Sequence, residues 1–548
     1  MAGRESAAGS HWLCGSGRML IAMADGPIIL TTLNARYSHA ALGLRYLAAN
    51  MGELSARTVI REYTINDPAA VVVESLLAMA PCIIGFGVYI WNLRETTRIV
   101  RLIKALAPHI TVVIGGPEVS HEYADEPLVA LADVLAVGEA DLAFAQICRI
   151  VLQGGVPGHI VQCAKPDLAA LRLPYALYTE EDLRQRLIYV EASRGCPFTC
   201  EFCLSSIEEG VRTFPLAALL DDLSALIARG CRTFKFVDRT FNLSPRTCAA
   251  ILEFFRAAYV PGMFLHFEMV PDRLPDALKS LISAFPPGAI QFEIGIQSFT
   301  PRVGELIARR MDRARTVENL TWLTRSSGVH VHADLIIGLP GETMASLAES
   351  FDALWWLHPG EIQVGILKLL KGTPLVRHRE AFAMVYNPEP PYDLLASRDF
   401  DFPTMQRLKR FARYFELYAN SGRFPESLEL LIARGGGAPF AALLAFSDWL
   451  WAGSRQEHGI SLKHLYELLI TYLDTLAPAG HAEALQCVAQ DFINTQGNPT
   501  GSLKGLPEVL RLAVEELLRQ SRAAAPRPAA LPAYRLAGPG GVSHAPLP

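Results

Sequence analysis

The chain has 548 residues, of which 51% are hydrophobic, and its formal net charge is -5. That length indicates several domains. The near balance of 50 Lys+Arg against 55 Asp+Glu argues against a strongly basic protein that binds nucleic acid. No uninterrupted apolar run approaches the roughly 18 residues of a membrane-spanning helix, so no membrane is expected as a partner. Residues 1–26 lack the basic start and apolar core of a secretory signal, and we expect them to be disordered.

Residues 27–152 alternate between apolar runs and helical patterns. Buried strands are predicted at residues 27–33, 82–88, 110–114 and 134–137, and helices at 40–51 and 93–106. Apolar strands separated by helices indicate an α/β fold with a doubly wound parallel sheet, whose ligands bind at the carboxyl ends of the strands. Glycines, which let a ligand approach the backbone, lie at or just past the ends of these strands at Gly85, Gly87, Gly115, Gly116 and Gly138. Residues 27–152 are therefore predicted to be a ligand-binding domain.

The rest of the chain divides into three further parts. The Gly- and Pro-rich composition after Gln153 predicts a linker over residues 153–185. Six strands follow, at 187–191, 234–237, 264–267, 291–296, 332–337 and 361–367. They predict a partial (β/α)6 barrel of the TIM type over residues 186–386, with its chemistry at the carboxyl ends of the strands. A Pro-rich break then precedes a predicted helical domain at 387–522, and the Ala/Pro/Gly-rich residues 523–548 are expected to be disordered.

Three of the 10 cysteines lie close together. Cys196, Cys200 and Cys203 have the spacing C-x3-C-x2-C directly after a predicted strand. Thiolates are soft ligands for zinc or an iron–sulfur cluster. A structural zinc site takes four ligands, and this loop has no fourth Cys or His, whereas a four-iron cluster on three thiolates keeps one iron open. We therefore predict an iron–sulfur cluster in a reducing cytoplasm. The alternatives are chance clustering of the cysteines and a zinc site completed by a distant residue.

The segment SRGCPFTCEFC resembles the radical S-adenosylmethionine (SAM) superfamily. The resemblance implies that the open iron of a [4Fe–4S] cluster binds SAM, which one electron cleaves to a 5′-deoxyadenosyl radical. The motifs FEIGIQSF, DLIIGLPGET and KGTPL resemble the fourth-, fifth- and sixth-strand motifs of that barrel. The SAM contacts expected from these motifs and from the end of the second strand are Phe202, Asp238, Glu293, Gln297, Ser298, Ile336 and Gly338. Ordinary packing at strand ends is the alternative for each of these residues.

The N-terminal domain is similar to the cobalamin-binding domain that precedes many radical SAM barrels. The similarity lies in GFGVYIWN, IGGPEVS and VGEAD. The cobalamin contacts that it implies are Ser38, His39, Gly85, Gly87, Val88, Tyr89, Gly115, Gly116, Glu118, Gly138 and Glu139. The Asp-x-His-x-x-Gly motif that supplies a cobalt ligand in other cobalamin domains is absent. We therefore expect His39 to cap or hydrogen-bond rather than to bind cobalt.

The combined resemblance implies a cobalamin-dependent radical SAM methyltransferase that acts on an unactivated carbon. Its partners would be a small-molecule substrate and a low-potential electron donor such as flavodoxin or ferredoxin. The segment after Pro388 resembles an uncharacterised helical domain found in one branch of these enzymes. Two alternatives remain open. One is radical cyclisation or oxidation with cobalamin as an electron carrier, and the other is a non-enzymatic protein that binds cobalamin or responds to redox state.

Overall fold

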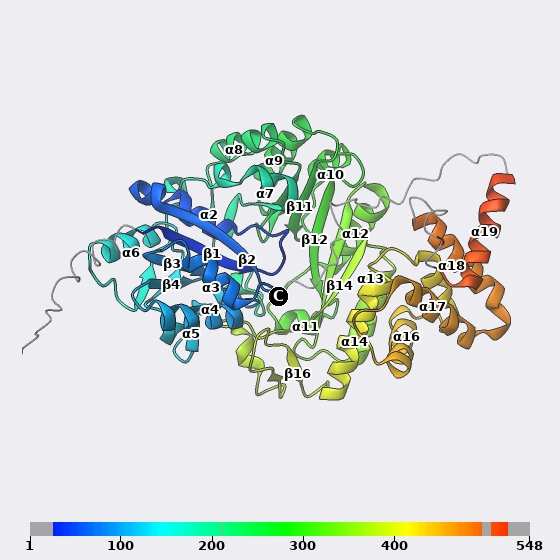
Figure 1. The fold of residues 1–548 in the computed structure, drawn as a ribbon. Helices are drawn as coiled ribbons and strands as arrows, with labels where there is room; N and C mark the ends of the chain where they lie inside the picture. Colours follow the sequence, from blue (N-terminus) through cyan, green and yellow to red (C-terminus); the bar gives the residue numbers. More distant parts are fainter. Residues whose placement is uncertain (1–25, 209, 496–502, 504–505, 524–548) are drawn as a thin grey trace, which may run out of the picture. The chain divides into compact units, whose positions relative to one another are not determined.

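The computed structural model describes residues 26–208, 210–495, 503 and 506–523. The expectations of disorder at 1–26 and 523–548 lie, except for Gly26 and Ala523, outside the described residues. The chain divides into two compact units, residues 1–189 and 190–548 (Figure 1). No single helix among the described residues is long and apolar enough to cross a membrane, although one pair of helices bent by 97° passes the same test together.

The first unit contains a six-stranded parallel sheet in the order β2-β1-β3-β4-β5-β6. Its strands are β1 (Ile28–Asn34), β2 (Thr58–Thr64), β3 (Ile83–Gly87), β4 (Thr111–Gly115), β5 (Val134–Gly138) and β6 (Ile160–Cys163). The strand order reverses between β1 and β3. In open α/β sheets such a switch point is where a ligand crevice forms, outside the carboxyl ends of the strands. The predicted doubly wound parallel sheet is confirmed.

Helices cover both faces of this sheet (Figure 1). They are α2 (Leu42–Ala49), α3 (Ala69–Leu77), α4 (Leu93–Leu106), α5 (Pro127–Leu131) and α6 (Ala143–Leu152). Ile29 and Ile84 pack in one buried cluster with residues of α3, α4 and α5, while Ile28 and Leu30 pack in a second cluster with residues of α2 and α6. Because the central strands are buried on both sides, they form continuous apolar runs in the sequence.

Two edge strands of this sheet were not predicted. β2 is only partly buried, and β6 exposes Ile160 at 44%. Their mixed polar and apolar residues do not form the apolar runs that marked the central strands. β6 and the short helix α7 (Glu180–Gln185) both lie in residues 153–185, which the sequence reading treats as a linker. This segment therefore contributes a strand to the first sheet.

The second sheet has six strands in the order β14-β13-β12-β11-β10-β7, and adjacent strands from β10 to β14 pair in parallel. They are β7 (Ile188–Val190), β10 (Thr233–Phe236), β11 (Phe264–Met269), β12 (Ile290–Gln297), β13 (His330–Ile337) and β14 (Glu361–Ile366). The connecting helices are α8 (Leu216–Ala228), α9 (Pro245–Ala257), α10 (Asp276–Ser283), α11 (Pro301–Leu306), α12 (Arg313–Ser326) and α13 (Met344–Trp355). Sequential strands joined by helices are the arrangement of the predicted partial barrel, which is confirmed.

The chain beyond β14 is mainly helical. A small antiparallel pair, β15 (Val385–Tyr386) and β16 (Leu394–Ala396), precedes the helices. These are α14 (Phe402–Tyr418), α15 (Pro425–Arg434), α16 (Pro439–Ser454), α17 (Leu462–Leu476), α18 (His481–Thr495) and α19 (Glu508–Ala523). Phe351 of α13 packs against Phe411, Phe415 and Phe440. The predicted helical C-terminal region is therefore confirmed, and an aromatic cluster joins it to the barrel.

Candidate cofactor sites

The three clustered cysteines lie on the loop between β8 (Ser193–Gly195) and a short 3-10 helix, η5 (Leu204–Ile207). β8 pairs antiparallel with β9 (Val211–Thr213) beyond the loop. Gly195 has a φ of +90°, and a Cβ there would lie 2.2 Å from the Gly210 carbonyl oxygen. Only glycine fits this position, so the residue before the first cysteine of the motif closes the loop tightly.

The thiols of Cys196, Cys200 and Cys203 are free. Burial raises the pKa of Cys200, and Arg309, whose Nη1 lies 3.6 Å from the Cys200 Sγ, opposes that shift. Among the described residues, no group of three or more His, Cys, Asp or Glu side chains is close enough together to hold a single metal ion. A four-iron cluster binds each thiolate at a different iron, so its ligands stand further apart than those of one ion. Three free thiols on one loop fit the donor set of such a cluster.

Glu201, inside the cysteine motif, ties the loop to the rest of the barrel unit. Its amide donates to the Ile307 carbonyl at 3.0 Å, and its carbonyl accepts from the Leu375 amide at 3.1 Å. Its buried carboxylate lies 2.8 Å from His378 Nε2 and forms an ion pair with Arg377. The sequence analysis missed this residue. The available signal was a charged residue inside the cysteine motif, between Cys200 and the aromatic Phe202.

Asp238, predicted to contact SAM or substrate, follows β10 and is buried against the residues that lead into the cysteine loop. Its carboxylate accepts the Ala192 amide at 2.9 Å and the Ser193 hydroxyl at 2.5 Å. Burial raises its pKa, and these hydrogen bonds oppose that shift. Both carboxylate oxygens are therefore engaged in fixing the backbone that leads into the cysteines. A contact with SAM remains a prediction for this residue.

The strands of the barrel present ionisable residues on one face. Glu293 of β12 lies 3.0 Å from His266 Nε2 of β11 and 3.4 Å from Lys235 Nζ of β10. Burial favours the neutral acid, but His266 and Lys235 outweigh it and hold the pKa of Glu293 below its ordinary value. Burial also lowers the pKa of His266 to about 4, so this imidazole is neutral at pH 7. Glu293 is thus an ionised carboxylate on the inner face.

Unsatisfied buried polar atoms lie at the carboxyl end of β12 and within the neighbouring strand β13. Gln297 has a φ of +67°, and its Oε1 is buried without a hydrogen-bond partner. Asp334 Oδ1 also lacks a hydrogen bond and lies 3.5 Å from His332 Nε2. Burial, followed by the charges of Glu293 and Glu268, raises the pKa of Asp334 well above its ordinary value. Buried polar groups without partners are rare, so this region fits a polar ligand that would complete them.

Arg309 links this region to the cysteine loop. One terminal nitrogen faces Cys200, the other donates to the Gly295 carbonyl, and Nε is buried without a hydrogen-bond partner. The sequence analysis did not single out Arg309 or Asp334, because neither stands in a spacing typical of a known ligand set. Only the fold brings Arg309 beside Cys200 and Gly295, and Asp334 onto the strand next to Gly295.

The other expected SAM residues lie in the same unit. Ser298 Oγ accepts the Thr300 amide at 3.2 Å, and Phe202 and Ile336 are half-buried. Gly338, with a φ of +91°, donates its amide to Glu342 Oε2 at 2.8 Å. A Cβ at Gly338 would lie 2.5 Å from Leu394 Cδ2 of β16, so this glycine is required by packing. None of these contacts tests the predicted role in SAM binding.

Gly87, Gly115 and Gly138 end the adjacent parallel strands β3, β4 and β5, and so lie at one edge of the sheet. The prediction that Gly85 also lies at a strand end is wrong, because this residue pairs with Leu30 and Val113 in the middle of β3. A Cβ at Gly85 would lie 2.8 Å from the Phe144 ring, and one at Gly116 would lie 2.4 Å from the Val88 carbonyl oxygen. Packing inside the domain therefore already requires these two glycines. The Gly87 carbonyl accepts from Thr32 Oγ1 at 2.7 Å, so this turn is also tied to β1.

The remaining predicted cobalamin residues surround the same strand ends. Tyr89 stacks on Trp91 with ring centroids 4.5 Å apart, and Glu118 is buried. The Val88 amide donates to the Gly115 carbonyl at 2.8 Å. Gly138 has a φ of +90° and follows β5, and Glu139 next to it is half-buried. Their predicted contacts with cobalamin stay predictions.

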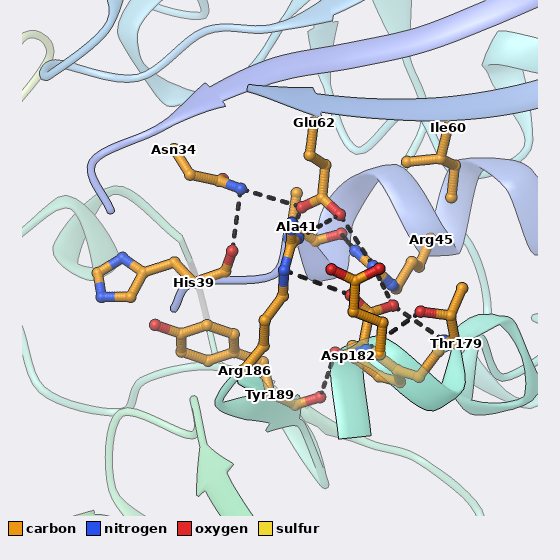
Figure 2. Close-up of polar contacts among 12 residues, drawn as sticks. Asn34, His39, Ala41, Arg45, Ile60, Glu62, Thr179, Asp182, Arg186 and Tyr189 are labelled. Atoms are coloured by element: carbon orange, nitrogen blue, oxygen red, sulfur yellow. Dashed lines mark hydrogen bonds and ion pairs between the residues drawn. The ribbon is translucent and has the colours of Figure 1, made fainter. Parts of the chain in front are cut away.

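Ser38 and His39 lie on the loop between β1 and α2, which Figure 2 shows around His39. The His39 carbonyl accepts from Asn34 Nδ2 at 2.9 Å, and the Ser38 carbonyl accepts from the Leu187 amide at 2.9 Å. The His39 ring packs edge-on against Tyr189 with centroids 6.2 Å apart. The backbone of this loop is thus firmly held next to the switch point of the sheet.

Three family models match successive parts of the chain. The B12 binding domain model matches residues 28–148, the Radical SAM superfamily model matches 190–354, and a model described as a protein of unknown function (DUF4080) matches 380–518. Together they follow the division into a first sheet, a barrel and C-terminal helices.

Curated relatives are similar over a large part of the chain. The cobalamin-dependent radical SAM methyltransferase TokK of Streptomyces tokunonensis is 24% identical over 470 residues, which cover 77% of this chain and 66% of TokK. The 2-(S-pantetheinyl)-carbapenam-3-carboxylate methyltransferase of Streptantibioticus cattleyicolor is 26% identical over 310 residues, covering 50% of this chain and 45% of that protein. The aligned chain thus spans less than two thirds of the length of either relative.

Two solved structures share the fold. The radical SAM methyltransferase TsrM from Kitasatospora setae, with cobalamin and a [4Fe–4S] cluster bound, has a TM-score of 0.55 at 16% identity, over 91% of this chain and 99% of TsrM. The cobalamin-dependent SAM radical enzyme OxsB has a TM-score of 0.56 at 14% identity, over 92% of this chain and 81% of OxsB. The family models thus show that the chain contains a B12-binding domain, a radical SAM domain and a C-terminal DUF4080 region, and the two solved structures share its fold.

Proposed function

We propose that this protein is a cobalamin-dependent radical SAM methyltransferase that transfers a methyl group to an unactivated carbon of a small molecule. The observation that carries the proposal is the presence, in one chain, of a B12-binding sheet with a switch point and a radical SAM barrel with three free cysteine thiols. The proposed division is a cobalamin domain at 27–152, a barrel at 186–386 and a helical domain at 387–522.

In this proposal Cys196, Cys200 and Cys203 hold a [4Fe–4S] cluster, and cobalamin binds at the carboxyl edge of the first sheet. When bound, the cluster supplies the electron that cleaves SAM to a 5′-deoxyadenosyl radical, and cobalamin carries the methyl group. The cysteine loop is kept in place by Glu201 and Asp238, whose carboxylates accept hydrogen bonds from protein donors. Their part is to position the thiols.

The polar atoms at the carboxyl end of β12 and within β13 would bind SAM. Gln297 Oε1 and Asp334 Oδ1 are acceptors without a hydrogen bond, suited to the hydroxyl or ammonium groups of that molecule. Arg309 brings a positive charge to the same place. The proposed contacts are Phe202, Asp238, Glu293, Gln297, Ser298, Ile336 and Gly338.

The turns of the first sheet would bind cobalamin through a set of backbone and side-chain contacts. The proposed residues are Ser38, His39, Gly85, Gly87, Val88, Tyr89, Gly115, Gly116, Glu118, Gly138 and Glu139. The backbone of the Ser38–His39 loop is held by Asn34 and Leu187. We propose that His39 shapes this loop and does not bind cobalt.

The test is anaerobic turnover by the full-length protein reconstituted with iron, sulfide and hydroxocobalamin. Methyl-labelled SAM and a metabolite extract as the source of substrate should yield 5′-deoxyadenosine and a product that carries the label. Formation of 5′-deoxyadenosine with an unlabelled, rearranged or oxidised product would favour the radical cyclase or oxidase instead. Failure to cleave SAM with a fully loaded cluster would favour the non-enzymatic binding protein.

The proposal also includes a reductant and a compartment. A low-potential flavodoxin or ferredoxin would supply electrons, so reduced flavodoxin should support turnover in place of a chemical reductant. Because all nine cysteines among the described residues are free thiols, we propose a reducing location such as the cytoplasm. If dithionite supports turnover but neither flavodoxin nor ferredoxin does, the proposed electron donor is wrong.

A further inference from the structure

A buried network of four charged side chains lies beside the loop that follows β1 (Figure 2). Arg45 of α2 lies 2.9 Å from Glu62 of β2 and 2.9 Å from Asp182 of α7. Arg186 lies 2.9 Å from the same Glu62 and 3.4 Å from the same Asp182. The four side chains are between 3% and 11% exposed. We call these four residues the charge clamp.

The Glu62 carboxylate is the centre of the clamp because it accepts from four donors. The two arginines bind one oxygen, and the other accepts the Ala41 amide at 2.6 Å and Asn34 Nδ2 at 3.1 Å. Asn34 ends β1, and Ala41 directly precedes α2. One buried carboxylate therefore holds both ends of the loop at residues 35–40.

The other side of the clamp fastens the segment around α7 to the same loop. Asp182 forms a capping box with Thr179 at the start of α7. The Arg186 guanidinium stacks on the Tyr37 ring at 4.6 Å, and Leu187 donates its amide to the Ser38 carbonyl at 2.9 Å. The loop at 35–40 is therefore held from β1, from α2 and from the chain that follows α7.

Burial opposes ionisation of Glu62, but the charge of Arg45 and the hydrogen bonds outweigh it and keep the pKa of Glu62 below its ordinary value. All four clamp residues are thus charged at neutral pH, and their charges cancel. A buried ion pair that loses one partner leaves an uncompensated charge, which is far more costly than losing an exposed pair. Because its carboxylates are occupied by protein donors, the clamp acts through the loop and not by contact with a ligand.

We infer that Glu62 is a positioning residue which holds Ser38 and His39 at the cobalamin crevice beside the β1–β3 switch point. The inference rests on the proposed function, because it takes cobalamin as the occupant of that crevice. In this inference the conformation of the loop at residues 35–40 is fixed by Glu62 on edge strand β2 and by Arg186, which lies more than a hundred positions further along the chain. The loop is pre-formed, so binding does not have to order it.

The first experiment uses Glu62→Gln in the full-length protein, with hydroxocobalamin as the probe. Glutamine keeps the size of the side chain and one acceptor but removes the charge that faces two arginines. We expect the dissociation constant for hydroxocobalamin to rise at least tenfold, or about 1.4 kcal/mol. Amide hydrogen exchange of residues 35–41 should accelerate, while iron content and SAM binding of the barrel unit stay as in the wild type.

Two further variants keep the test decisive if Glu62→Gln folds poorly. Asn34→Ala removes the hydrogen bonds to Glu62 and to the His39 carbonyl without changing the charge, and should weaken hydroxocobalamin binding severalfold with faster exchange in the loop. The matched control Glu53→Gln removes the same charge from an exposed ion pair with Arg149, on the first unit but away from the loop. It should bind hydroxocobalamin as the wild type does.

The outcomes separate the inference from the proposed function. If the wild type does not bind hydroxocobalamin, the proposed function itself fails and the inference with it. If the wild type binds but Glu62→Gln and Asn34→Ala bind equally well, the inference alone is overturned. Faster exchange in the loop with unchanged binding would overturn it too, since the clamp would then hold a loop that cobalamin does not use.

Discussion

The two parallel sheets bury their strands in different ways. Strand β1 of the first sheet is buried at every position from Ile28 to Asn34. Strand β12 of the second sheet alternates, with Phe292 and Ile294 buried and Glu293 and Gly295 partly exposed. The first sheet has helices on both faces, whereas β12 of the second sheet alternates between buried apolar residues and partly exposed residues that include Glu293.

This difference locates the chemistry in each unit. A sheet covered on both faces offers a ligand only its edge, where the carboxyl ends of the strands and their turns lie. A partial barrel also offers the inner face of its strands, where Glu293, Asp334 and His266 would form part of the proposed site. Polar substitutions inside a strand should therefore damage stability on either face of the first sheet, but in the second sheet only on the apolar face, while substitutions on its polar face should damage the proposed chemistry.

The largest effect is expected from the cysteines that the barrel unit presents. Replacing Cys196, Cys200 or Cys203 with alanine should each abolish 5′-deoxyadenosine formation and lower the iron content from about four per chain, because in the proposed function every thiolate holds an iron. Cys248→Ala is the matched control, since burial raises the pKa of that thiol to about 12 and it lies on α9. Retained SAM cleavage in all three single variants would disprove the cluster assignment.

Polar substitutions on the two sheets sharpen the comparison directly. Ile84→Asn in β3 and Ile294→Asn on the outer face of β12 should each cost about 3 kcal/mol or more, because a buried apolar side chain is replaced by an unpaired polar one. Glu293→Gln on the inner face should cost less stability and yet lower SAM cleavage at least tenfold. Urea unfolding and 5′-deoxyadenosine assays measure the two effects. Equal stability losses in all three would show that the faces of β12 do not differ.

The pH dependence of stability offers a third test in the barrel unit. Burial raises the pKa of Glu342 from 4.5 to about 8, where its Oε2 accepts the Gly338 amide. The native state then binds more protons than the unfolded chain between these pH values, so stability falls as pH rises from about 4.5 to 8. Over this pH range the wild type should lose on the order of a few kcal/mol of unfolding free energy through this carboxyl, and Glu342→Gln should not show that loss.

Melting temperatures of the apoprotein at pH 5 and pH 8.5 check this prediction. The wild type should lose stability between the two values, and Glu342→Gln should lose clearly less. The control Glu318→Gln, exposed on α12, should behave as the wild type. An identical decline in wild type and Glu342→Gln would mean that this carboxyl does not stay neutral in the folded state.

The smallest effect is expected at the edge of the first sheet. His39→Ala should leave the absorption spectrum of bound cobalamin unchanged, because the contacts that fix this loop come from the His39 backbone, Asn34 and Leu187. A shifted cobalt spectrum in the variant would identify His39 as a ligand. A variant that merely binds cobalamin less tightly, with the same spectrum, agrees with a role for the loop alone.

The sequence by itself predicted those parts of the protein in which local pattern and tertiary environment agree. Strands β1, β3, β4 and β5 are buried on both sides and therefore stand out as apolar runs. The cysteine spacing was equally readable, because three ligands on one loop need no distant partner. The N-terminal α/β domain, the partial barrel and the helical C-terminal region were all predicted from such local signals.

Only the tertiary structure decided the contacts between distant residues. Edge strands β2 and β6 were not predicted, because partly exposed strands contain both polar and apolar residues and so form no apolar run. Glu62, the centre of the charge clamp, lies on β2. No spacing could pair Glu62 with Arg186, or Arg309 with Cys200, since each pair meets through the fold. Asp238 shows the same limit, because its position at a strand end was predicted but its binding to Ala192 and Ser193 was not. Ionic and hydrogen-bonded contacts depend on three-dimensional proximity, which periodicity along a chain does not encode.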